Sequence, residues 1–591
     1  MGYHFLDLSK EEKHERRHLL DWYGLTAQAS ILAPLLTLQL YFLAVWIDRR
    51  WRNRNEFDAP SSPPAKREQR GGKSGLLRTA KNASRQILWW NSDPVDVLGC
   101  HLGSKGDVLG AAIWTVWLLF LCFPQTGEDY LHLAKRFGAI GASQLPLQYL
   151  LAFKSPYSPL QLLTRSSHET LNCLHQHLGY IITGFFYTHV ALYVNFYVVK
   201  NLLAEKLLAG YILAGVFSVV AFTAIGTTAL APVRRWSYRV FYVVHVALAT
   251  LLLPVLFFHV SHVRLYLYET AAVYAVNAVL RLLNTKTYDG TLQLIPDTGL
   301  LEIVVQLPKS ALSCWEPGHH AYVSLAGHPL NRTFKSNPFT VASLPAADGH
   351  LKFVAKILDG NTAKLARSMD NIKHSGPGQQ LSIEGPYGLG RHGNELLRYD
   401  RILFVAGGVG ATFVLPLYRQ LLADLSPSKG SYRRQKVQFL WIARSKAEII
   451  WSLPENANER QGFAERLSVY LTGPSTSTGS PIGSSTVGDG EDGSRVAFGE
   501  PAGGIELEEK ERLLVSDVGA GARQDTDEVA IHAGRPNLRK VVDQTFAYGT
   551  TERVAVIVCG PLGLSQALRE EVGRYVRRGR EVWFWEEKFA F

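Results

Sequence analysis

Two pairs of histidines with the same spacing lie inside long apolar segments. Thirteen residues separate His175 from His189, and thirteen separate His245 from His259. In an α-helix, fourteen steps carry a side chain about 21 Å along the axis but only about 40° around it, so each pair faces one way. Two such helices side by side would present a pair of imidazoles near each leaflet of an apolar layer about 30 Å thick. The pattern predicts two haem sites, each with two axial imidazoles, through His175, His189, His245 and His259.

A simpler interpretation is that each histidine makes an interhelical hydrogen bond. Ionisable residues inside membrane spans are rare and usually functional, and a repeated spacing favours ligation. His177 lies about 200° around the helix from His175, so it is the poorer ligand. His262 follows His259 by about one turn and is the main rival for the outer site. Three further histidines are expected in loops: His101, His132 and His168.

The bulk properties indicate a multidomain membrane protein. A chain of 591 residues is too long for one domain. Its apolar share of 47% is concentrated in the first half, and its net charge of +11 does not require a nucleic-acid partner. The five cysteines show no CxxC motif and no disulfide framework. The first twenty residues are highly charged, so we expect no cleaved signal peptide.

Hydropathy predicts seven membrane spans, with six as the alternative count. The spans are expected at 29–47, 108–123, 137–153, 173–195, 209–230, 239–259 and 266–283. The third is short and carries Gln144, Pro146 and Gln148, so a re-entrant segment is the alternative there.

Basic residues predict the orientation of these spans. From Arg49 to Arg85 there are eleven Lys/Arg against three Asp/Glu, and further basic residues precede the sixth span and follow the seventh. Loops rich in Lys and Arg stay in the cytoplasm, which puts the N-terminus outside. His175 and His245 then share the inner haem, and His189 and His259 share the outer one. The sequon at Asn82 becomes cytoplasmic and unglycosylated.

From about residue 287 the sequence is typical of a soluble protein. Alternating runs (LEIVVQL, HAYVSLA, LKFVAKIL, QLSIEG) predict an antiparallel β-barrel. From about 400, buried runs (RILFVA, VQFLWIA, VAVIVCG, EVWFWEE) alternate with helical segments and predict a parallel sheet. Residues 472–527 are rich in Gly, Ser, Thr and Pro and are expected to form a disordered insertion.

Three motifs in the soluble half suit cofactor binding. The glycines of VAGGVGAT follow a strand and precede a helix, which favours a dinucleotide phosphate, although Phe413 replaces the last glycine of the full pattern. In NPFT, Thr340 is placed to hydrogen-bond a flavin ring and Phe339 to pack beside it. In DGNT, Thr362 is expected to cap a helix whose start suits a pyrophosphate, with a plain capped loop as the alternative. EGPYG supplies a turn at the barrel rim.

Together these segments resemble the fungal ferric reductases, relatives of the NADPH oxidases, with a soluble half similar to ferredoxin–NADP reductases. LPLQYLLAFKSPYSPLQLLT and LNCLHQHLGY also resemble the membrane segments of that family. The family has HPFT at the flavin site. This chain has Asn337 in place of the histidine, and Asn keeps a hydrogen-bonding side chain.

The resemblance implies roles for the cofactor residues. FAD is expected to contact Asn337, Pro338, Phe339, Thr340, Asp359, Gly360, Thr362, Gly385 and Tyr387. NADPH is expected at Gly407, Gly408, Gly410, Arg444, Arg535, Gly560 and Pro561. An arginine after the second strand suits the 2′-phosphate of NADP. Cys559 of CGPLG would lie where hydride leaves the nicotinamide, with a buried structural cysteine as the alternative. Phe591 would stack on the flavin.

The resemblance also implies the whole protein's organisation. We expect an N-terminal part with the first span and basic loop (1–107), a di-haem membrane domain (108–286), an FAD-binding β-barrel (287–395) and an NAD(P)-binding α/β domain (396–591). Electrons would pass from cytoplasmic NADPH through FAD and two b-type haems to chelated Fe(III), with Cu(II) left open as an acceptor. A superoxide-generating oxidase is the alternative. The plasma membrane is the expected location, with the vacuole as alternative, and coupling to a separate iron uptake system is left open.

Overall fold

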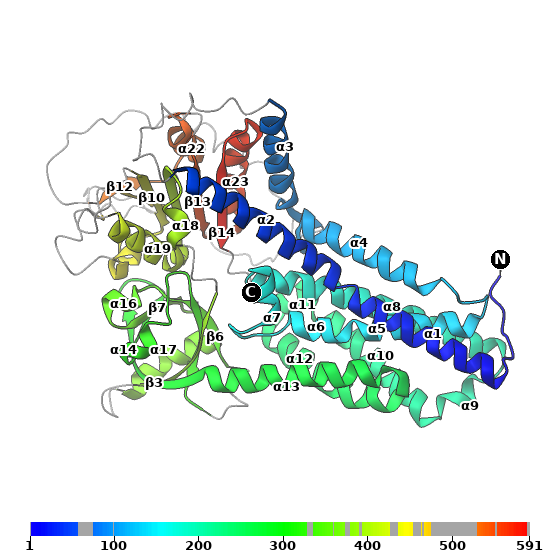
Figure 1. Ribbon diagram of the computed structural model, residues 1–591. Helices are drawn as coiled ribbons and strands as arrows, with labels where there is room; N and C mark the ends of the chain where they lie inside the picture. The colour runs from blue at the N-terminus through cyan, green and yellow to red at the C-terminus, as the bar shows by residue number, and fades with distance from the viewer. Residues whose placement is uncertain are drawn as a thin grey trace, which may run out of the picture.

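The chain forms a long helical half and a half built on two sheets (Figure 1). The computed structural model describes residues 2–56, 75–97, 100–327, 335–358, 360–372, 379–388, 393–425, 435–452, 463, 466–473, 529–549 and 552–587. The predicted insertion at 472–527 lies almost wholly outside the described residues, as do Asp359 and Phe591.

The helical half consists of long helices lying side by side (Figure 1). They are α1 (Lys10–Ala29), α2 (Leu32–Glu56), α4 (Lys105–Cys122), α5 (Tyr130–Ser143), α6 (Leu145–Leu151), α8 (His168–Val199), α10 (Gly210–Thr228), α12 (Tyr238–His259) and α13 (Arg264–Asn284). Shorter helices α7 (Pro159–Thr164), α9 (Leu203–Leu207) and α11 (Ala231–Trp236) connect them.

Within the described residues, five segments are long and apolar enough to cross a membrane, against the seven spans predicted. They are Lys10–Asp48, Lys105–Cys122, His168–Val199, Gly210–Thr228 and Tyr238–His259. The predicted span 137–153 is divided between α5 and α6, because Gln144 ends α5 and Pro146 enters the first turn of α6. The predicted span 266–283 falls within α13, which carries charged residues among its apolar ones.

The first sheet follows the membrane helices without a linker, since α13 ends at Asn284 and β3 begins at Thr285. Its order is β6-β5-β8-β3-β4-β7, and every pair is antiparallel. The strands are β3 (Thr285–Ile295), β4 (Leu300–Val305), β5 (His320–Leu325), β6 (Asn337–Thr340), β7 (Leu351–Lys356) and β8 (Gln379–Tyr387). The four alternating runs of the sequence are β4, β5, β7 and β8, which confirms the predicted strands.

The second sheet is parallel, with the order β12-β11-β10-β9-β13-β14. Its strands are β9 (Arg401–Gly407), β10 (Lys436–Ala443), β11 (Leu467–Leu471), β12 (Ala530–Ala533), β13 (Val554–Cys559) and β14 (Val582–Glu587). The chain order reverses between β9 and β13, and ligands of such sheets bind at the carboxyl ends of the strands there. Helices α19 (Ala411–Asp424), α22 (Leu538–Phe546) and α23 (Leu562–Arg577) flank the sheet.

One hydrophobic cluster joins the two sheets. Side chains of the first sheet, including Ile295, Leu300 and Val354, belong to the same buried cluster as Phe413 and Val414 of α19. Arg419 of α19 also forms a two-pronged ion pair with Asp348, with both bonds 2.9 Å long. The soluble half is therefore one packed body that meets the membrane half along its edge.

Candidate functional site

The inner histidine pair comes from α8 and α12. Ser167 and Ser237 cap these helices, each accepting a backbone N–H of the first turn. The rings of His175 and His245 face each other with centroids 6.1 Å apart and planes tilted by 56°. Metal–imidazole bonds are about 2.0–2.1 Å long in protein zinc sites, so a gap of this size takes one metal ion.

Hydrogen bonding prepares His175 as a ligand. Its Nδ1 donates to the carbonyl of Gln148 over 3.0 Å, which leaves Nε2 as the nitrogen that a metal would take; Nε2 lies 3.4 Å from the side-chain nitrogen of Gln148. Nδ1 of His245 is buried and has no hydrogen-bond partner among the described atoms. No group of three or more His, Cys, Asp or Glu suited to a metal ion occurs in the described part of the chain. A two-imidazole donor set fits axial ligation of a haem, whose ring supplies the other donors.

The outer histidines lie further along the same two helices. Nδ1 of His189 donates to the carbonyl of Ala134 over 2.7 Å, and Nδ1 of His259 donates to that of Tyr211 over 2.6 Å. Both tautomers therefore expose Nε2.

Two glycines face the outer rings closely. A Cβ on Gly138 of α5 would lie 2.8 Å from Nδ1 of His189, and one on Gly215 of α10 would lie 2.6 Å from Cε1 of His259. Glycine at these positions lets α5 and α10 close around the two imidazoles. No motif in the sequence pointed to these glycines.

The rival histidines are engaged elsewhere. Nε2 of His177 bonds the carbonyl of Leu102 over 2.9 Å. His262 lies 3.7 Å from the carboxylate of Asp21 on α1.

The prediction that three histidines lie in loops was wrong for each of them. His132 is in α5, 2% exposed, and bonds Arg136 over 2.9 Å. His101 is in β2 (Cys100–Ser104), and His168 is the first residue of α8. Each of these histidines lies in a short strand or near the start of a helix, where the surrounding sequence is polar and gives no clear periodic pattern.

A cavity of about 1730 Å³ joins the inner histidine pair to the soluble half. Its walls include His175 and His245 from the membrane helices and Thr340 and Trp585 from the two sheets. Other lining residues from the soluble half include Gly318, His320, Tyr322, Pro338, Glu384, Gly388, Leu562 and Glu587. A cofactor in this cavity could therefore contact both sheets and approach the inner pair.

The NPFT segment forms β6, which pairs with β5 at the cavity. Pro338 and Thr340 line the cavity, whereas Phe339 packs against the core of the first sheet, because neighbouring side chains of a strand point to opposite faces. Asn337 accepts a hydrogen bond of 3.1 Å from the side chain of Asn361. The segments NPFT and DGNT, far apart in sequence, thus meet.

Helix α17 (Asn361–Ile372) begins two residues earlier than a cap at Thr362 would require. Thr362 is inside the first turn, and its hydroxyl bonds both the N–H and the carbonyl of Leu358, at 2.9 and 2.8 Å. The prediction that Thr362 caps this helix was therefore wrong. Gly360 before the helix has φ of +96°, a conformation that favours glycine.

A charged and aromatic cluster joins the first sheet to the membrane helices. Arg281 of α13 donates two hydrogen bonds, of 2.7 and 3.0 Å, to Glu384 of β8. Burial opposes ionisation of Glu384, but the bonds from Arg281 outweigh it and hold the pKa of this carboxyl below its usual range. The hydroxyl of Tyr387 also donates to Glu384 over 2.7 Å. A Cβ on Gly385 would lie 2.9 Å from the ring of Trp315.

Three further contacts cross this junction. Nζ of Lys154 lies 3.5 Å from the ring centroid of Tyr322, and burial lowers the pKa of Lys154 to about 7. Nε2 of His320 lies 3.3 Å from Glu169 at the start of α8. The ring of His320 stacks on Tyr387 with centroids 5.7 Å apart. This cluster was not predicted, because its members are brought together only by the fold.

The glycine turn after β9 has one open position. Cβ atoms on Gly407 and Gly410 would meet the turn after β13, at 2.6 Å from Cδ of Pro561 and 2.3 Å from the carbonyl oxygen of Cys559. Gly408 has φ of +55°, and a Cβ there would have no neighbour within 4 Å, so its backbone is open to a phosphate. Two of the three glycines therefore allow the close packing of this turn against the turn after β13.

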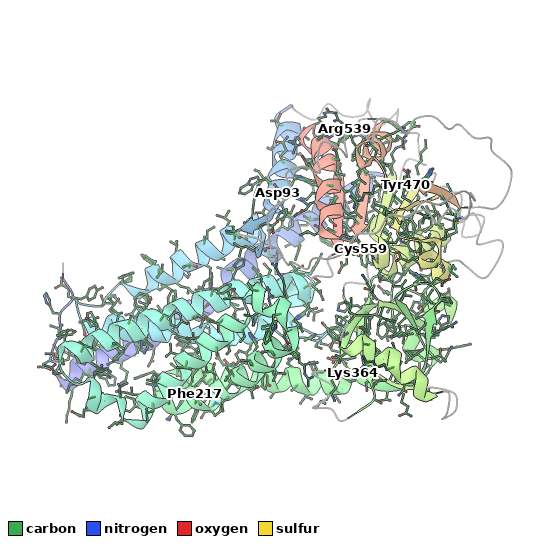
Figure 2. All side chains as sticks on the ribbon, turned by 180° about the vertical axis from the view of Figure 1, so that it is seen from behind. Asp93, Phe217, Lys364, Tyr470, Arg539 and Cys559 are labelled. Atoms are coloured by element: carbon green, nitrogen blue, oxygen red, sulfur yellow. The ribbon has the colours of Figure 1, made fainter. Side chains whose placement is uncertain are left out.

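The CGP turn follows β13, beside the glycine turn. Cys559 is the last residue of β13 and lies at the edge of the second sheet that faces the first sheet (Figure 2). Its side chain is fully buried, and this burial raises the pKa of the thiol well above its usual range. A Cβ on Gly560 would lie 3.0 Å from Cα of Gly407, so the two turns are in backbone contact.

The two predicted phosphate-binding arginines are exposed at the carboxyl edge of the second sheet. Arg444 directly follows β10, and its N–H donates to Glu448 over 3.0 Å. Arg535 follows β12, just before Asn537 caps α22. This is the edge where nucleotides bind in parallel sheets.

Comparison with known proteins agrees with this architecture. Residues 137–256 match the ferric reductase like transmembrane component, 288–390 an FAD-binding domain, and 399–573 the ferric reductase NAD binding domain. The probable metalloreductase AIM14 of Meyerozyma guilliermondii is 26% identical over 461 residues, which cover 76% of this chain and 83% of that protein.

Two further relatives match over shorter stretches. The probable cell surface ferric reductase kap2 of Aspergillus oryzae is 25% identical over 59% of this chain, which spans about half (49%) of that protein. Ferric/cupric reductase transmembrane component 2 of Schizosaccharomyces pombe is 23% identical over 53% of this chain and 61% of that one. The predicted fold class is confirmed, and the chain carries a ferric reductase like transmembrane component followed by FAD-binding and NAD-binding domains, as do its fungal ferric reductase homologues.

Proposed function

We propose that the protein is a transmembrane ferric-chelate reductase that takes electrons from cytoplasmic NADPH. They would pass through FAD and two b-type haems to Fe(III) chelates outside, with Cu(II) as a further acceptor. The observation that carries the proposal is the single cavity whose walls include both sheets and the inner histidine pair.

The residues of the chain would bind and orient the cofactors. His175 with His245, and His189 with His259, would hold the haems through Nε2. Gly408 and the start of α19 would receive the pyrophosphate of NADPH, and Arg444 and Arg535 its 2′-phosphate. When bound, FAD accepts a hydride and passes electrons on singly, chemistry that belongs to the cofactor.

A second group of residues would contact the flavin and the nicotinamide. Asn337, Pro338, Thr340, Gly385 and Tyr387 would line the FAD site, with Phe339 supporting it from behind. Gly360 and Thr362 would shape its pyrophosphate end, together with Asp359. Cys559, Gly560 and Pro561 would form the turn beside the nicotinamide, and Phe591 would cover the flavin.

The membrane orientation has support from Asn82. A Cβ on Gly579, in the NAD-binding domain, would lie 2.9 Å from the side-chain nitrogen of Asn82, so a glycan there would collide with that domain. We propose that this domain and the basic loop are cytoplasmic and that the protein lies in the plasma membrane. Coupling to a separate iron uptake system would follow from Fe(II) release outside.

The test is an anaerobic spectrum of the purified protein before and after NADPH, with haem and flavin counted per chain, followed by addition of an Fe(III) chelate under argon. We expect two haems and one flavin, bleaching of the flavin and oxidation of the haems by the chelate. Fewer than two haems per chain would overturn the proposal. Iron reduction that requires oxygen would show a superoxide-generating oxidase instead.

A further inference from the structure

Helix α3 (Gly75–Asn91) lies on the NAD-binding domain, although its neighbours in sequence are the membrane helices α2 and α4. The indole of Trp89 packs edge-on against Phe584 of β14, with ring centroids 5.6 Å apart. A Cβ on Gly573 of α23 would lie 3.1 Å from Nε1 of Trp89. Arg85 forms an ion pair with Glu581, and Gln86 donates to the carbonyl of Arg577 over 3.0 Å.

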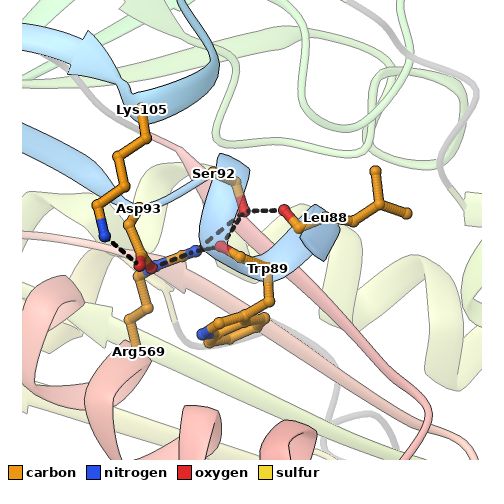
Figure 3. Close-up of polar contacts among 6 residues, drawn as sticks. All are labelled: Leu88, Trp89, Ser92, Asp93, Lys105 and Arg569. Carbon is orange, nitrogen blue, oxygen red and sulfur yellow. Dashed lines mark hydrogen bonds and ion pairs between the residues drawn. The ribbon is translucent and has the colours of Figure 1, made fainter. Parts of the chain in front are cut away.

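One carboxylate, that of Asp93, joins the membrane half to the NAD-binding domain (Figures 2 and 3). Its Oδ2 accepts a bond of 3.1 Å from Lys105, the first residue of α4. Its Oδ1 accepts bonds of 3.3 and 3.1 Å from Nε and Nη2 of Arg569 on α23. A membrane helix and the NAD-binding domain are thus held by the same side chain.

Arg569 is largely buried in this contact, and its Nη2 has several acceptors. The residue is only 9% exposed, and Nη2 also donates to the carbonyl of Trp89 and to the hydroxyl of Ser92, both over 2.9 Å (Figure 3). Its guanidinium lies 4.3 Å from the ring centroid of Trp89. Removing the anionic partner of such a buried cation is strongly destabilising.

The soluble half therefore meets the membrane half at two separate places. The first is the pair Arg281–Glu384 beside the first sheet. The second is α3 with Ser92 and Asp93, which we call the clasp. The cavity that reaches the inner histidine pair is lined by Arg281 and Glu384, and also by Ser92 and Arg569.

We propose that the clasp fixes the orientation of the whole soluble half relative to the inner histidine pair, with Asp93 as a positioning residue. One attachment leaves a packed body free to pivot, whereas two separate attachments remove that rotation. Because one hydrophobic cluster joins the two sheets, loosening the clasp should leave hydride transfer between them intact. It should slow the electron step from the soluble half to the inner pair, a role that rests on the proposed function.

The test compares Asp93→Asn with Asp543→Asn. Asp543 accepts bonds of 3.0 Å from Arg574 and 2.8 Å from Tyr575, and so forms a similar carboxylate contact within the NAD-binding domain alone. Rapid anaerobic mixing of the cofactor-loaded protein with NADPH follows flavin bleaching and haem reduction separately. Hydrogen exchange of the amides in 79–91 and 562–577 reports the clasp directly.

For Asp93→Asn we expect flavin bleaching within about twofold of wild type, haem reduction slowed about tenfold, and faster exchange in both segments. Asp543→Asn should change neither haem reduction nor exchange in 79–91. Combining Asp93→Asn with Arg569→Gln should add little to the larger single effect. If Asp93→Asn does not load flavin, Gln566→Ala, which removes the 3.3 Å bond to Asp96, serves as the milder variant with the same expected pattern.

Two results would overturn the role of the clasp. One is equal slowing of flavin bleaching and haem reduction in Asp93→Asn, and the other is unchanged hydrogen exchange in 79–91 and 562–577. A wild-type protein whose haems stay oxidised while its flavin bleaches would instead refute the proposed function. Hydrogen exchange would still decide the clasp in that case.

Discussion

The inner and outer histidine pairs lie on the same two helices, α8 and α12, but in different environments. Both outer rings are fixed by backbone carbonyls, and each is approached closely by a glycine of a neighbouring helix. The inner pair has one ring held by a carbonyl and lies on a cavity that extends to both sheets. We infer that the outer site depends on helix packing, whereas the inner site depends on how the soluble half docks.

The largest expected effect is the loss of an inner ligand. His245→Ala should lower Fe(III)-chelate reduction by about 100-fold or more, beyond the 10–100-fold typical of residues that only support a ligand. NADPH reduces the flavin before any electron reaches the inner site, so flavin bleaching should persist in this variant. His177→Ala is the matched control, since its ring bonds Leu102, and it should keep two haems per chain.

The pairing itself can be broken by a double variant. His189→Ala and His259→Ala should each remove one haem, and the double variant should remove no more than that one. A double variant that lost both haems would refute the assignment of these two residues to one site. Haem counts per chain decide between the outcomes.

The second prediction tests the packing of the outer site. Gly215→Ala should weaken outer haem binding about 10–100-fold, because the new Cβ would lie 2.6 Å from the ring of His259. The inner haem should be unaffected. Gly184→Ala is the control, since a Cβ there meets nothing within 4 Å. Titration of the haem-free protein with haem measures the two affinities, and equal weakening of both sites would contradict the comparison.

The third prediction concerns docking at the inner site. Glu384→Gln should lower the free energy of unfolding by about 1–3 kcal/mol, because Arg281 loses a charged partner at a buried junction. Glu302→Gln is the control, since its pair with Lys352 connects two strands of the same sheet. Denaturant unfolding of the flavin-loaded protein in detergent gives both values, and a larger effect for Glu302→Gln would refute the importance of this junction.

Local patterns predicted the elements well. The four alternating runs became β4, β5, β7 and β8, because a half-buried strand shows its period of two directly. LSVYL and AIHA, which form β11 and β12, were missed since they are short and lie on either side of the long polar segment. The division of 137–153 into α5 and α6 depended on one proline near a helix end.

The site was only partly predictable for a different reason. The histidine pairs repeat within a helix, so their common face follows from the spacing alone. Arg281 and Glu384 are 103 positions apart, and their contact depends on how β8 folds back against α13. Gly215 carries no side chain to suggest a role. Such contacts arise only from tertiary packing.

The smallest effect at pH 5 is expected for Glu587, which lines the cavity beside the inner pair. Burial, with a smaller contribution from the charge of Glu169, raises the pKa of Glu587 from 4.5 to about 8. The folded protein therefore holds a proton here between pH 4.5 and 8 that the unfolded chain releases. Its contribution to stability is complete below pH 4.5 and is lost as the pH rises through 8, with a slope of up to about 1.4 kcal/mol per pH unit.

Glu587→Gln imitates the protonated carboxyl, so the variant should match wild type near pH 4.5 and become more stable than wild type as the pH rises, because this slope disappears. Unfolding of the cofactor-free protein from pH 5 to 9 measures it, and the curves of wild type and variant should diverge with rising pH. Parallel curves would show that Glu587 is hydrated. The cavity beside the inner pair would then be open to water in the cofactor-free protein.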